Sequence, residues 1–431
     1  MKQLIWNELE EPERKAALQR PEQRASLELH AEVEAIVDDV RSGGWDRLCA
    51  LARRIDGEEP KLTRVPPLAD EARRSLGSDA IAAIETAARN IRTFHEASIP
   101  SDLSVETVPG LIVRKLWRPI DRVGIYVPGG RTPLFSTLLM LAIPASVAGV
   151  GEIVVVTPPR PGSGLDPVIA LAAEISGVEA IWTVGGAQAI AALAYGVGPI
   201  ARVDKICGPG NAWVAKAKQI VASEPGGPAI DLPAGPSELM VIADDSADPR
   251  LVAADLLSQA EHDPTAQVLL VTNCVPLVTE VQGALETQLA SLPRQSIARA
   301  SLASARLILT ADLEQAVGIA NLYAPEHLSL VVSNAEQLVP RIRNAGAVFV
   351  GRLAAETFGD YLAGSSHVLP TDGAARASGG VSVYTFLKAM SVQSLTAEAA
   401  RQIAPAAALL ARIEALEAHA RAADARLELV K

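Results

Sequence analysis

Residues Val123-Gly-Ile-Tyr-Val-Pro-Gly-Gly130 carry the clearest indication of the fold class of this chain. Its first five residues have the length and apolar character of a buried strand, and the proline and two glycines after them predict a turn. A helix is expected over about 134–148 and a second buried strand over 153–157. This succession of strand, turn and helix is typical of a parallel sheet covered by helices.

The same succession continues to residue 350. Strands are expected at 180–184, 203–206, 238–242, 267–272, 306–309, 329–332 and 348–350, and helices at about 167–176, 187–195, 211–222, 249–262, 275–292, 312–321 and 335–344. The prolines and glycine of 233–236 interrupt the pattern, so a hinge is expected near 233–237. The chain is therefore predicted to be an α/β protein with two βα blocks.

The segments around these blocks differ from them in character. Residues 1–24 are polar and charged and are expected to form an arm outside any core. Residues 26–95 have the apolar spacing of helices. The region 351–380, rich in glycine and serine, is expected to be loop-like. From about residue 383 the pattern is helical and alanine-rich; this part is too thin to fold alone, so we expect it to pack on another domain or subunit.

The composition indicates a globular, acidic protein. Of its 431 residues 49% are hydrophobic, and 39 basic against 50 acidic residues leave a net charge of −11. Without a basic run, this balance argues against binding to nucleic acid or to an anionic membrane. The charge-free stretch between Arg131 and Glu152 contains Pro133 and Pro144, which favours a buried helix over a membrane span.

The compartment is predicted from the N-terminus and the cysteines. No apolar core follows Lys2, so no signal peptide is expected. Three cysteines far apart in sequence predict neither a disulfide framework nor a cysteine-built zinc site, and they fit a reducing cytoplasm.

Three glycine turns lie at the ends of predicted strands: Gly129-Gly130, Gly185-Gly186 and Gly208-Pro209-Gly210. The strict three-glycine dinucleotide fingerprint is absent. Such turns let backbone N–H groups approach a phosphate, and ligands of open α/β sheets bind beyond the carboxyl ends of the strands. The turns favour a nucleotide modestly, with tight turns lacking any ligand as the alternative. Cys207 precedes the third turn, where a buried inert thiol is favoured over a nucleophile.

Two groups of polar residues are candidates for chemistry. Asp255, Gln259 and His262 fall on one face of the helix expected at 249–262, where they are either solvated or hold a metal. Glu326 and His327 come at the entrance of a predicted strand. A neutral imidazole beside a carboxylate suits general acid–base catalysis near pH 7, and a solvated pair is an equal alternative.

Two further pairs lie towards the C-terminus. Asp360 and His367 belong to the loop-like region, where an acid and a base are as often solvated as functional. Glu414 and His419 lie on the C-terminal helix about 140° apart, so they cannot share a face but can flank one ligand. Zinc accepts nitrogen and oxygen donors, although spacing alone does not select a ligand set from these residues.

Eight motifs together resemble the histidinol dehydrogenase family, nearly end to end and in order. They are Val123-Gly-Ile-Tyr-Val-Pro-Gly-Gly130, Val184-Gly-Gly-Ala-Gln-Ala-Ile-Ala191, Gly208-Pro-Gly-Asn211, Asp231-Leu-Pro-Ala-Gly-Pro-Ser-Glu238, Asp255-Leu-Leu-Ser-Gln-Ala-Glu-His262, Tyr323-Ala-Pro-Glu-His327, Gly359-Asp-Tyr361 and His367-Val-Leu-Pro-Thr371. The resemblance implies zinc-dependent oxidation of L-histidinol to L-histidine through L-histidinal, with NAD⁺ as acceptor, the final steps of histidine biosynthesis.

The resemblance also implies the roles of individual residues. Glu326 and His327 match the acid–base pair. Gln259, His262, Asp360 and His419 match the zinc ligands, and these four with Ser237, His327, His367 and Glu414 match the substrate contacts. Tyr126, Gln188 and Asn211 match positions that contact NAD. One zinc per subunit is implied.

The implied architecture is two incomplete Rossmann-like domains with small N-terminal and C-terminal segments. The expected boundaries are 1–24 for the arm, 25–125 with 238–381 for the domain carrying most metal and catalytic residues, 126–237 for the NAD-side domain, and 382–431 for a helical segment that reaches the partner of a homodimer. Three positions depart from the family pattern: Ala355, Ser366 and Thr385.

Two other functions compete with this one. The first is a dehydrogenase on the same scaffold for another polar alcohol, such as a sulfonated diol; His367 and Glu414 argue against it, because both suit an amino alcohol that bears an imidazole. The second is a zinc hydrolase with Glu326 as its base, which has no need of the glycine turns.

Overall fold

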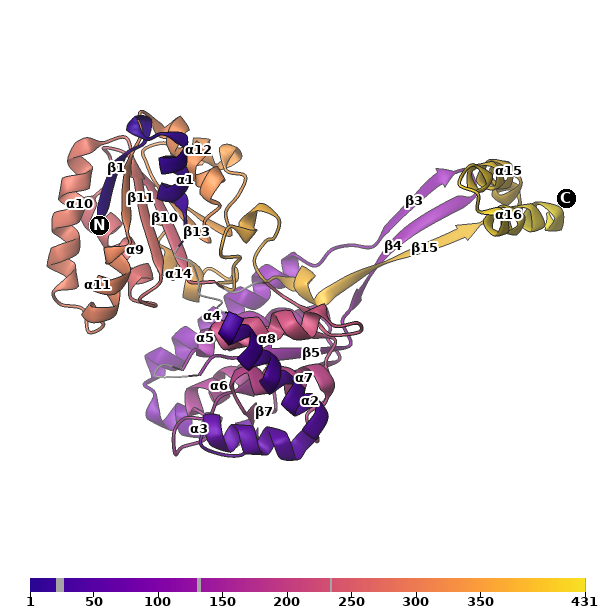
Figure 1. Ribbon diagram of the computed structural model, residues 1–431, viewed down its shortest axis with the longest axis horizontal. Helices are drawn as coiled ribbons and strands as arrows, with labels where there is room; N and C mark the ends of the chain where they lie inside the picture. The colour runs from indigo at the N-terminus through magenta and orange to yellow at the C-terminus, as the bar shows by residue number, and fades with distance from the viewer. Residues whose placement is uncertain (21–26, 130–132, 233–234, 431) are drawn as a thin grey trace.

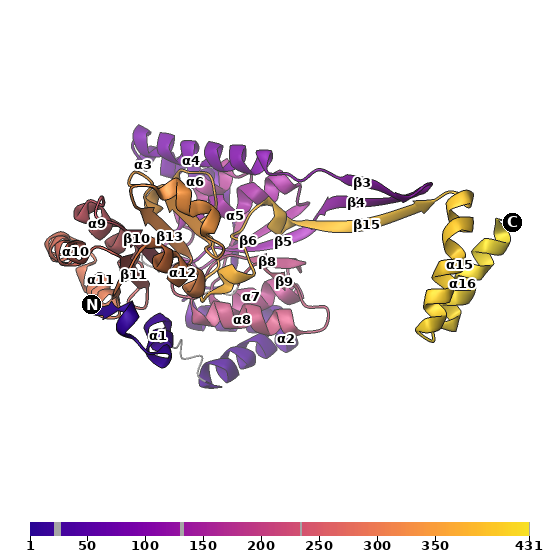
Figure 2. The same ribbon diagram turned by 90° about the horizontal axis from the view of Figure 1, so that it is seen from above.

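The computed structural model describes residues 1–20, 27–129, 133–232 and 235–430. Within them the chain forms two six-stranded sheets, here called sheet I and sheet II, each between layers of helices (Figure 1). A long three-stranded antiparallel ribbon leads away from sheet II and ends in two helices (Figure 2). The predicted α/β class is confirmed.

Sheet I is parallel, with the strand order β1-β12-β11-β10-β13-β14. Its strands are β1 (Lys2–Ile5), β10 (Glu238–Ala243), β11 (Gln267–Thr272), β12 (Arg306–Leu309), β13 (His327–Val331) and β14 (Ala347–Val350). One face carries α9 (Pro249–Ala260), α10 (Val275–Leu289) and α11 (Gln295–Ala303), and the other carries α1 (Glu11–Leu18), α12 (Leu313–Tyr323) and the short α13 (Ala335–Leu338). Leu239 and Val241 join the first core, and Met240 and Ile242 the second, because successive side chains of a strand point to opposite faces.

Sheet II has the order β2-β7-β6-β5-β8-β9, parallel except for the edge strand β2. Its strands are β2 (Lys61–Arg64), β5 (Arg122–Tyr126), β6 (Glu152–Thr157), β7 (Ala180–Thr183), β8 (Lys205–Cys207) and β9 (Ala229–Ile230). One face carries α3 (Val65–Ser75), α4 (Ser78–Ala97), α5 (Phe135–Ala148) and α6 (Pro167–Ile175), and the other α2 (Leu27–Ile55), α7 (Gly186–Tyr195) and α8 (Ala212–Ser223).

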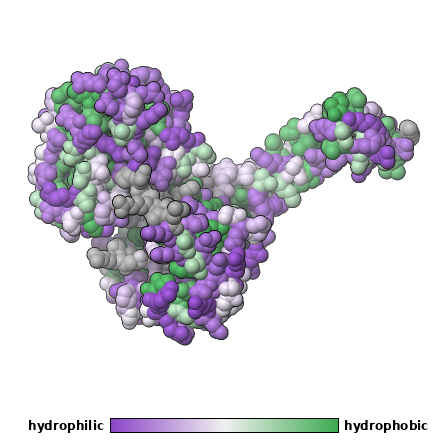
Figure 3. Space-filling model, viewed as in Figure 1, coloured by the Kyte–Doolittle hydropathy of each residue, from purple (hydrophilic) through white to green (hydrophobic). Residues whose placement is uncertain are grey.

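The ribbon consists of β15, β4 and β3 in that order. Its strands are β3 (Leu103–Val108), β4 (Leu111–Pro119) and β15 (Leu387–Leu395), and the helices at its end are α15 (Ala397–Ile413) and α16 (Glu417–Leu429). Apolar side chains gather on these helices (Figure 3), where Leu410 is 63% and Ile413 73% exposed. Such a surface on a thin helical pair favours an interface over a free surface.

The strands predicted from the apolar runs are all present within two residues of their expected ends. The helix expected over 335–344 is shorter: it ends at Leu338 and continues as a 3-10 turn, Val339–Arg341. The charge-free stretch forms the buried helix α5, as expected. Across the described ranges, no helix is both long and apolar enough to cross a membrane.

The prediction that residues 1–24 form an arm outside any core is wrong for residues 1–20, the part that the structure describes. Lys2–Ile5 pairs in parallel with β12 as an edge strand of sheet I. Leu4, Trp6 and Ala17 are buried in the second core of that sheet. A few apolar side chains in a polar segment are enough to bury one face of a single strand and a short helix.

The packing also differs from the expected grouping of 25–125 with 238–381. The helices α2, α3 and α4 cover sheet II, where their apolar residues share cores with α5, α6 and α7. The strand β2 extends the edge of the same sheet. Helical spacing marks an apolar face on each helix but does not say which sheet covers it.

The segment 382–431 is only partly helical. Its residues Leu387–Leu395 form β15, which pairs along its whole length with β4. β15 is largely exposed, β4 is about half-buried, and neither has a buried face, so their signal in the sequence is poor. Residues 21–24 of the expected arm, Gly130 of the first turn and residues 233–234 of the expected hinge lie outside the described residues.

Candidate active site

A cavity of about 310 Å³ lies between sheet I and sheet II. Sheet II contributes residues that follow its strands, Pro128 after β5 and Gly208 after β8. Sheet I contributes residues at the beginning of its strands: Ser237 before β10, and Glu326 and His327 at β13. Ligands of open α/β sheets usually bind at the carboxyl ends of strands. Sheet II follows this rule, whereas sheet I offers its amino edge.

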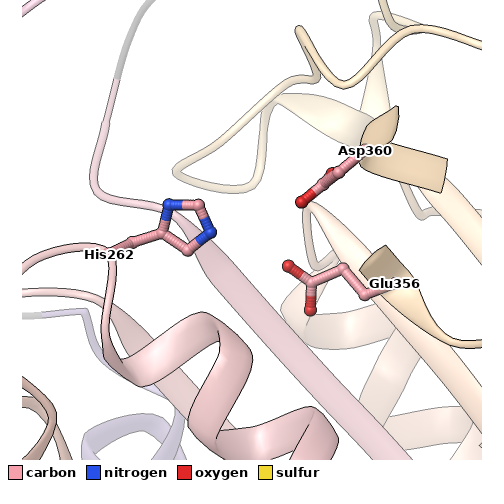
Figure 4. A group of neighbouring side chains, drawn as sticks. All are labelled: His262, Glu356 and Asp360. Atoms are coloured by element: carbon pink, nitrogen blue, oxygen red, sulfur yellow. The ribbon is translucent and has the colours of Figure 1, made fainter. Parts of the chain in front are cut away.

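Three of the four predicted metal ligands, Gln259, His262 and Asp360, line this cavity, together with Glu356. The ligand atoms of His262, Glu356 and Asp360 all lie within 4.8 Å of one another (Figure 4). Glu356 and Asp360 are four residues apart on α14 (Glu356–Tyr361), which places both carboxylates on one face of the helix. An imidazole and two carboxylates at this separation suit a divalent cation such as zinc.

Gln259 supports the same conclusion independently. Its side chain is fully buried, and neither atom of its amide has a hydrogen-bond partner among the described residues. Oε2 of Glu356 and Nε2 of His327 lack partners there as well. Buried polar groups are nearly always hydrogen-bonded, so unpaired groups around one cavity indicate side chains that serve a ligand. The donor set therefore fits a metal ion.

His327 is positioned as a base. Its Nδ1 lies 3.0 Å from the backbone carbonyl oxygen of Glu238. A carbonyl only accepts, so Nδ1 carries the proton and Nε2 is the basic atom. Nε2 is 3.8 Å from Oδ1 of Asp360. Burial lowers the pKa of His327 to about 3, so the ring is neutral at pH 7.

Among the described residues, none of Glu326, Glu356 and Asp360 forms an ion pair with a lysine or an arginine. Burial raises the pKa of Glu326 and of Glu356 well above the usual range, and nearby carboxylates add to both shifts. Burial also raises the pKa of Asp360, to about 6. An opposite charge within a few ångströms favours the ionised form of such groups. These carboxylates are therefore suited to a bound cation.

His367 connects the two halves of the cavity. Its Nδ1 donates to the backbone carbonyl oxygen of Asp360 at 3.0 Å, and its Nε2 lies 3.2 Å from Oγ1 of Thr137 on α5. Both ring nitrogens are therefore engaged within the chain. Burial lowers the pKa of His367 to about 4.

Two of the predicted site residues, Glu414 and His419, are not brought to this cavity. Both are exposed, and neither lines it. Glu414 directly follows α15, and His419 lies in α16. The ribbon carries both helices far from the two sheets, as both views show (Figures 1 and 2). One copy of the chain thus presents the predicted site only in part.

In two of the three glycine turns, backbone N–H groups are hydrogen-bonded to side chains of the chain itself. The N–H of Gly185 donates to Oδ2 of Asp56 at 3.0 Å, and that of Gly186 to the hydroxyl of Tyr126 at 3.3 Å. The N–H of Gly208 donates to Oδ2 of Asp231 at 2.6 Å. These backbone donors are therefore engaged, which weakens the expectation that they cradle a phosphate.

The predicted NAD contacts lie around these turns. Gln188 is buried, and its Nε2 donates to Oδ2 of Asp56 at 3.2 Å. Oδ1 of Asn211 caps α8 by accepting from the N–H groups of Trp213 and Val214, each at 3.1 Å. Tyr126, Gln188 and Asn211 are not among the described residues that line the cavity.

Cys207 is fully buried, and burial together with Asp231 raises the pKa of its thiol. A nucleophilic cysteine needs a thiolate, so the structure favours the inert thiol. Glu356 is the residue of the site that the sequence analysis missed. Its position four residues before Asp360 was the available signal.

Two largely parallel sheets, with imidazoles and carboxylates lining the cavity between them, define an α/β enzyme. The family model "Histidinol dehydrogenase" matches residues 18–427. The chain is 45% identical to histidinol dehydrogenase of Xylella fastidiosa (strain Temecula1 / ATCC 700964) over 99% of both chains, and 44% identical to that of Mannheimia succiniciproducens over the full length of both. The crystal structure of histidinol dehydrogenase from Elizabethkingia anophelis matches with a TM-score of 0.95 at 39% identity, covering 100% of this chain and 98% of that one. The chain therefore belongs to the histidinol dehydrogenase family and is an oxidoreductase.

Proposed function

We propose that this chain oxidises L-histidinol to L-histidine through L-histidinal, with zinc bound at the cavity and NAD⁺ as the electron acceptor. The observation that carries the proposal is one cavity lined by His262, Asp360 and Gln259, whose buried amide has no hydrogen-bond partner among the described residues. Their nitrogen and oxygen donors suit zinc. When bound, the ion supplies positive charge and a fixed point for the nitrogen atoms of the substrate.

His327 removes the alcohol proton through Nε2, the ring atom left free by the contact of Nδ1 with Glu238. The carbon loses hydride to NAD⁺ as the C–O bond becomes a carbonyl, which gives the aldehyde and NADH. Glu326 then takes a proton from water as the water oxygen adds to the aldehyde carbon. Protonated His327 returns its proton to the former carbonyl oxygen, which gives the hydrate and leaves Nε2 basic again. The hydrate loses a proton to His327 and a hydride to a second NAD⁺, and the resulting acid ionises to the carboxylate.

His419, the fourth metal ligand, and Glu414, a substrate contact, come from a second copy of the chain. The exposed apolar residues of α15, including Leu409 and Ile413, support such an interface. Glu414 follows α15 and His419 lies in α16. The ribbon carries both helices away from the two sheets of the same chain (Figure 2), so these two side chains can reach another molecule. The functional unit is thus a homodimer with shared sites.

NAD⁺ binds at the carboxyl edge of sheet II, next to Tyr126, Gln188 and Asn211. Tyr126 ends β5, while Gln188 and Asn211 lie at the beginnings of α7 and α8, so all three belong to the edge where open α/β sheets bind nucleotides. Free cysteines fit a cytoplasmic enzyme.

The test is the yield of NADH per histidinol consumed, with zinc present and with a chelator. Two NADH per histidinol, abolished by the chelator and restored by zinc, is the expected result. Zinc-loaded, folded protein that forms no NADH from histidinol would overturn the proposal and direct the search to other polar alcohols. Hydrolysis without NADH formation would point to the zinc hydrolase.

A further inference from the structure

Glu238, the first residue of β10, touches both members of the proposed acid–base pair. Its backbone N–H donates to Oε2 of Glu326 at 2.9 Å, and its backbone carbonyl oxygen lies 3.0 Å from Nδ1 of His327. Its side-chain Oε2 also accepts from the backbone N–H of Glu326, at 3.4 Å. The position of Glu238 therefore sets the direction of both catalytic side chains.

Arg20 holds the side chain of Glu238. Its Nε lies 2.5 Å from Oε1 and its Nη2 2.8 Å from Oε2 of that carboxylate, a two-point contact. Nη2 also donates to the backbone carbonyl oxygens of Tyr323, at 3.0 Å, and Ala324, at 3.4 Å. The guanidinium stacks on the Tyr323 ring, 3.9 Å from its centroid. Arg20 thus links the beginning of β10 to the turn that leads into Glu326 and His327.

We propose that Arg20 and Glu238 form a positioning clamp for the Glu326–His327 pair; this inference rests on the proposed function of that pair. The clamp joins the N-terminal segment, which the sequence analysis placed outside any core, to the catalytic edge of sheet I. Neither residue lines the cavity in the described part of the chain, so both act through the pair.

The charges explain why an arginine stands at this position. The Glu238 side chain is only 1% exposed and lies against Glu326, which is also buried. A buried carboxylate needs a partner, and two adjacent ones repel each other. The remaining carboxylate near the guanidinium is Asp372, whose Oδ1 is 4.0 Å from Nε of Arg20. Only a planar guanidinium binds a carboxylate at two points; an ammonium binds it at one.

The test compares Arg20→Met with Arg20→Lys and with Arg14→Met. Arg14 lies on α1 of the same segment and donates to the backbone carbonyl oxygen of Trp6, without contact to Glu238. We expect Arg20→Met to lower kcat about 10- to 100-fold, since a small displacement of catalytic groups costs that much. KM for histidinol and zinc content should stay within about twofold. Arg20→Lys should recover part of kcat, and Arg14→Met should leave it unchanged.

The double variant Arg20→Met/Glu238→Gln separates a clamp from two independent effects. Residues that act through each other give a double variant little worse than the more severe single one. If the fold-losses of kcat in the two single variants multiply in the double variant, the proposal is overturned. So would an Arg20→Met enzyme with normal kcat, or equal losses of kcat in Arg14→Met and Arg20→Met.

A readout independent of turnover distinguishes failure of the clamp from failure of the proposed function. In ¹⁵N-histidine-labelled protein, the signals of His327, assigned by their loss in His327→Asn, should shift in Arg20→Met and not in Arg14→Met. If the parent protein does not oxidise histidinol, the proposed function fails while these signals still test the clamp. Unshifted signals in Arg20→Met would overturn the clamp alone.

Discussion

Nδ1 of His327 lies 3.0 Å from the backbone carbonyl oxygen of Glu238, on the neighbouring strand of sheet I. This contact assigns the ring proton to Nδ1 and turns the basic Nε2 towards Asp360. A backbone carbonyl oxygen stays an acceptor at any working pH, and its direction is set by the strand that carries it. The pairing of β10 with β13 therefore holds the tautomer of His327. The base is thus set by the fold of sheet I, before any ligand binds.

Replacing His327 by asparagine tests its role in proton transfer. We expect His327→Asn to lower kcat for histidinol by at least about 100-fold, the usual contribution of a general base. Zinc content should stay near that of the parent, because the ring is not one of the proposed ligands. Steady-state kinetics and metal analysis of the same preparation measure both. Loss of the metal in this variant would show that the assigned role is wrong.

Mixing two inactive variants tests the shared site. His327→Asn and His419→Asn, unfolded together and refolded as a mixture, should regain about one quarter of the parent activity, because half of the dimers are mixed and one site of each is intact. Each variant refolded alone is the control and should remain inactive. If each site is built from one chain, the mixture will show no recovery.

Glu356 provides a test of the ligand set. It lies in the carboxylate–imidazole group of a single chain, whereas the proposed fourth ligand is His419 of a second copy. We expect Glu356→Gln to weaken zinc affinity about tenfold, as for a residue next to the ligands, and His419→Asn to weaken it more. Competition with a chromophoric chelator measures both affinities. If Glu356→Gln weakens zinc affinity more than His419→Asn does, Glu356 is the fourth ligand.

We expect His95, which lies outside the active site, to make the free energy of unfolding depend on pH. It is buried on α4 with no hydrogen-bond partner for its ring among the described residues, and burial lowers its pKa to about 4. Between pH 6.5 and 4 the unfolded chain binds the proton and the folded chain does not, so this residue destabilises the fold as the pH falls. The effect approaches ~3 kcal/mol at pH 4.

Denaturant unfolding of metal-free protein at pH 7 and pH 4 measures this effect. His95→Met should lose correspondingly less stability than the parent on acidification. His30→Gln, at an exposed histidine, is the matched control and should behave as the parent does. Equal losses in the parent and His95→Met would contradict the prediction.

The class of fold and most of its strands were determined by local sequence. Runs such as residues 239–243 are apolar on both faces, and this pattern is typical of buried parallel strands. The prediction that Cys207 is buried is likewise confirmed. The motifs around Glu326, His327 and His262 indicated the family, because their residue types and order are independent of tertiary contacts.

Contacts between residues far apart in the chain depend on tertiary packing. Helical spacing in 27–97 marks apolar faces but does not select sheet II over sheet I, and the weak alternation of β4 and β15 concealed the ribbon. The approach of Glu356 to His262, and of Arg20 to Glu238, joins segments far apart in the chain. Local propensity acts over a few residues, whereas these contacts arise from the packing of whole sheets and helices. Local sequence therefore accounts for most of the elements and for the family, whereas the geometry of the site depends on how the folded chain packs.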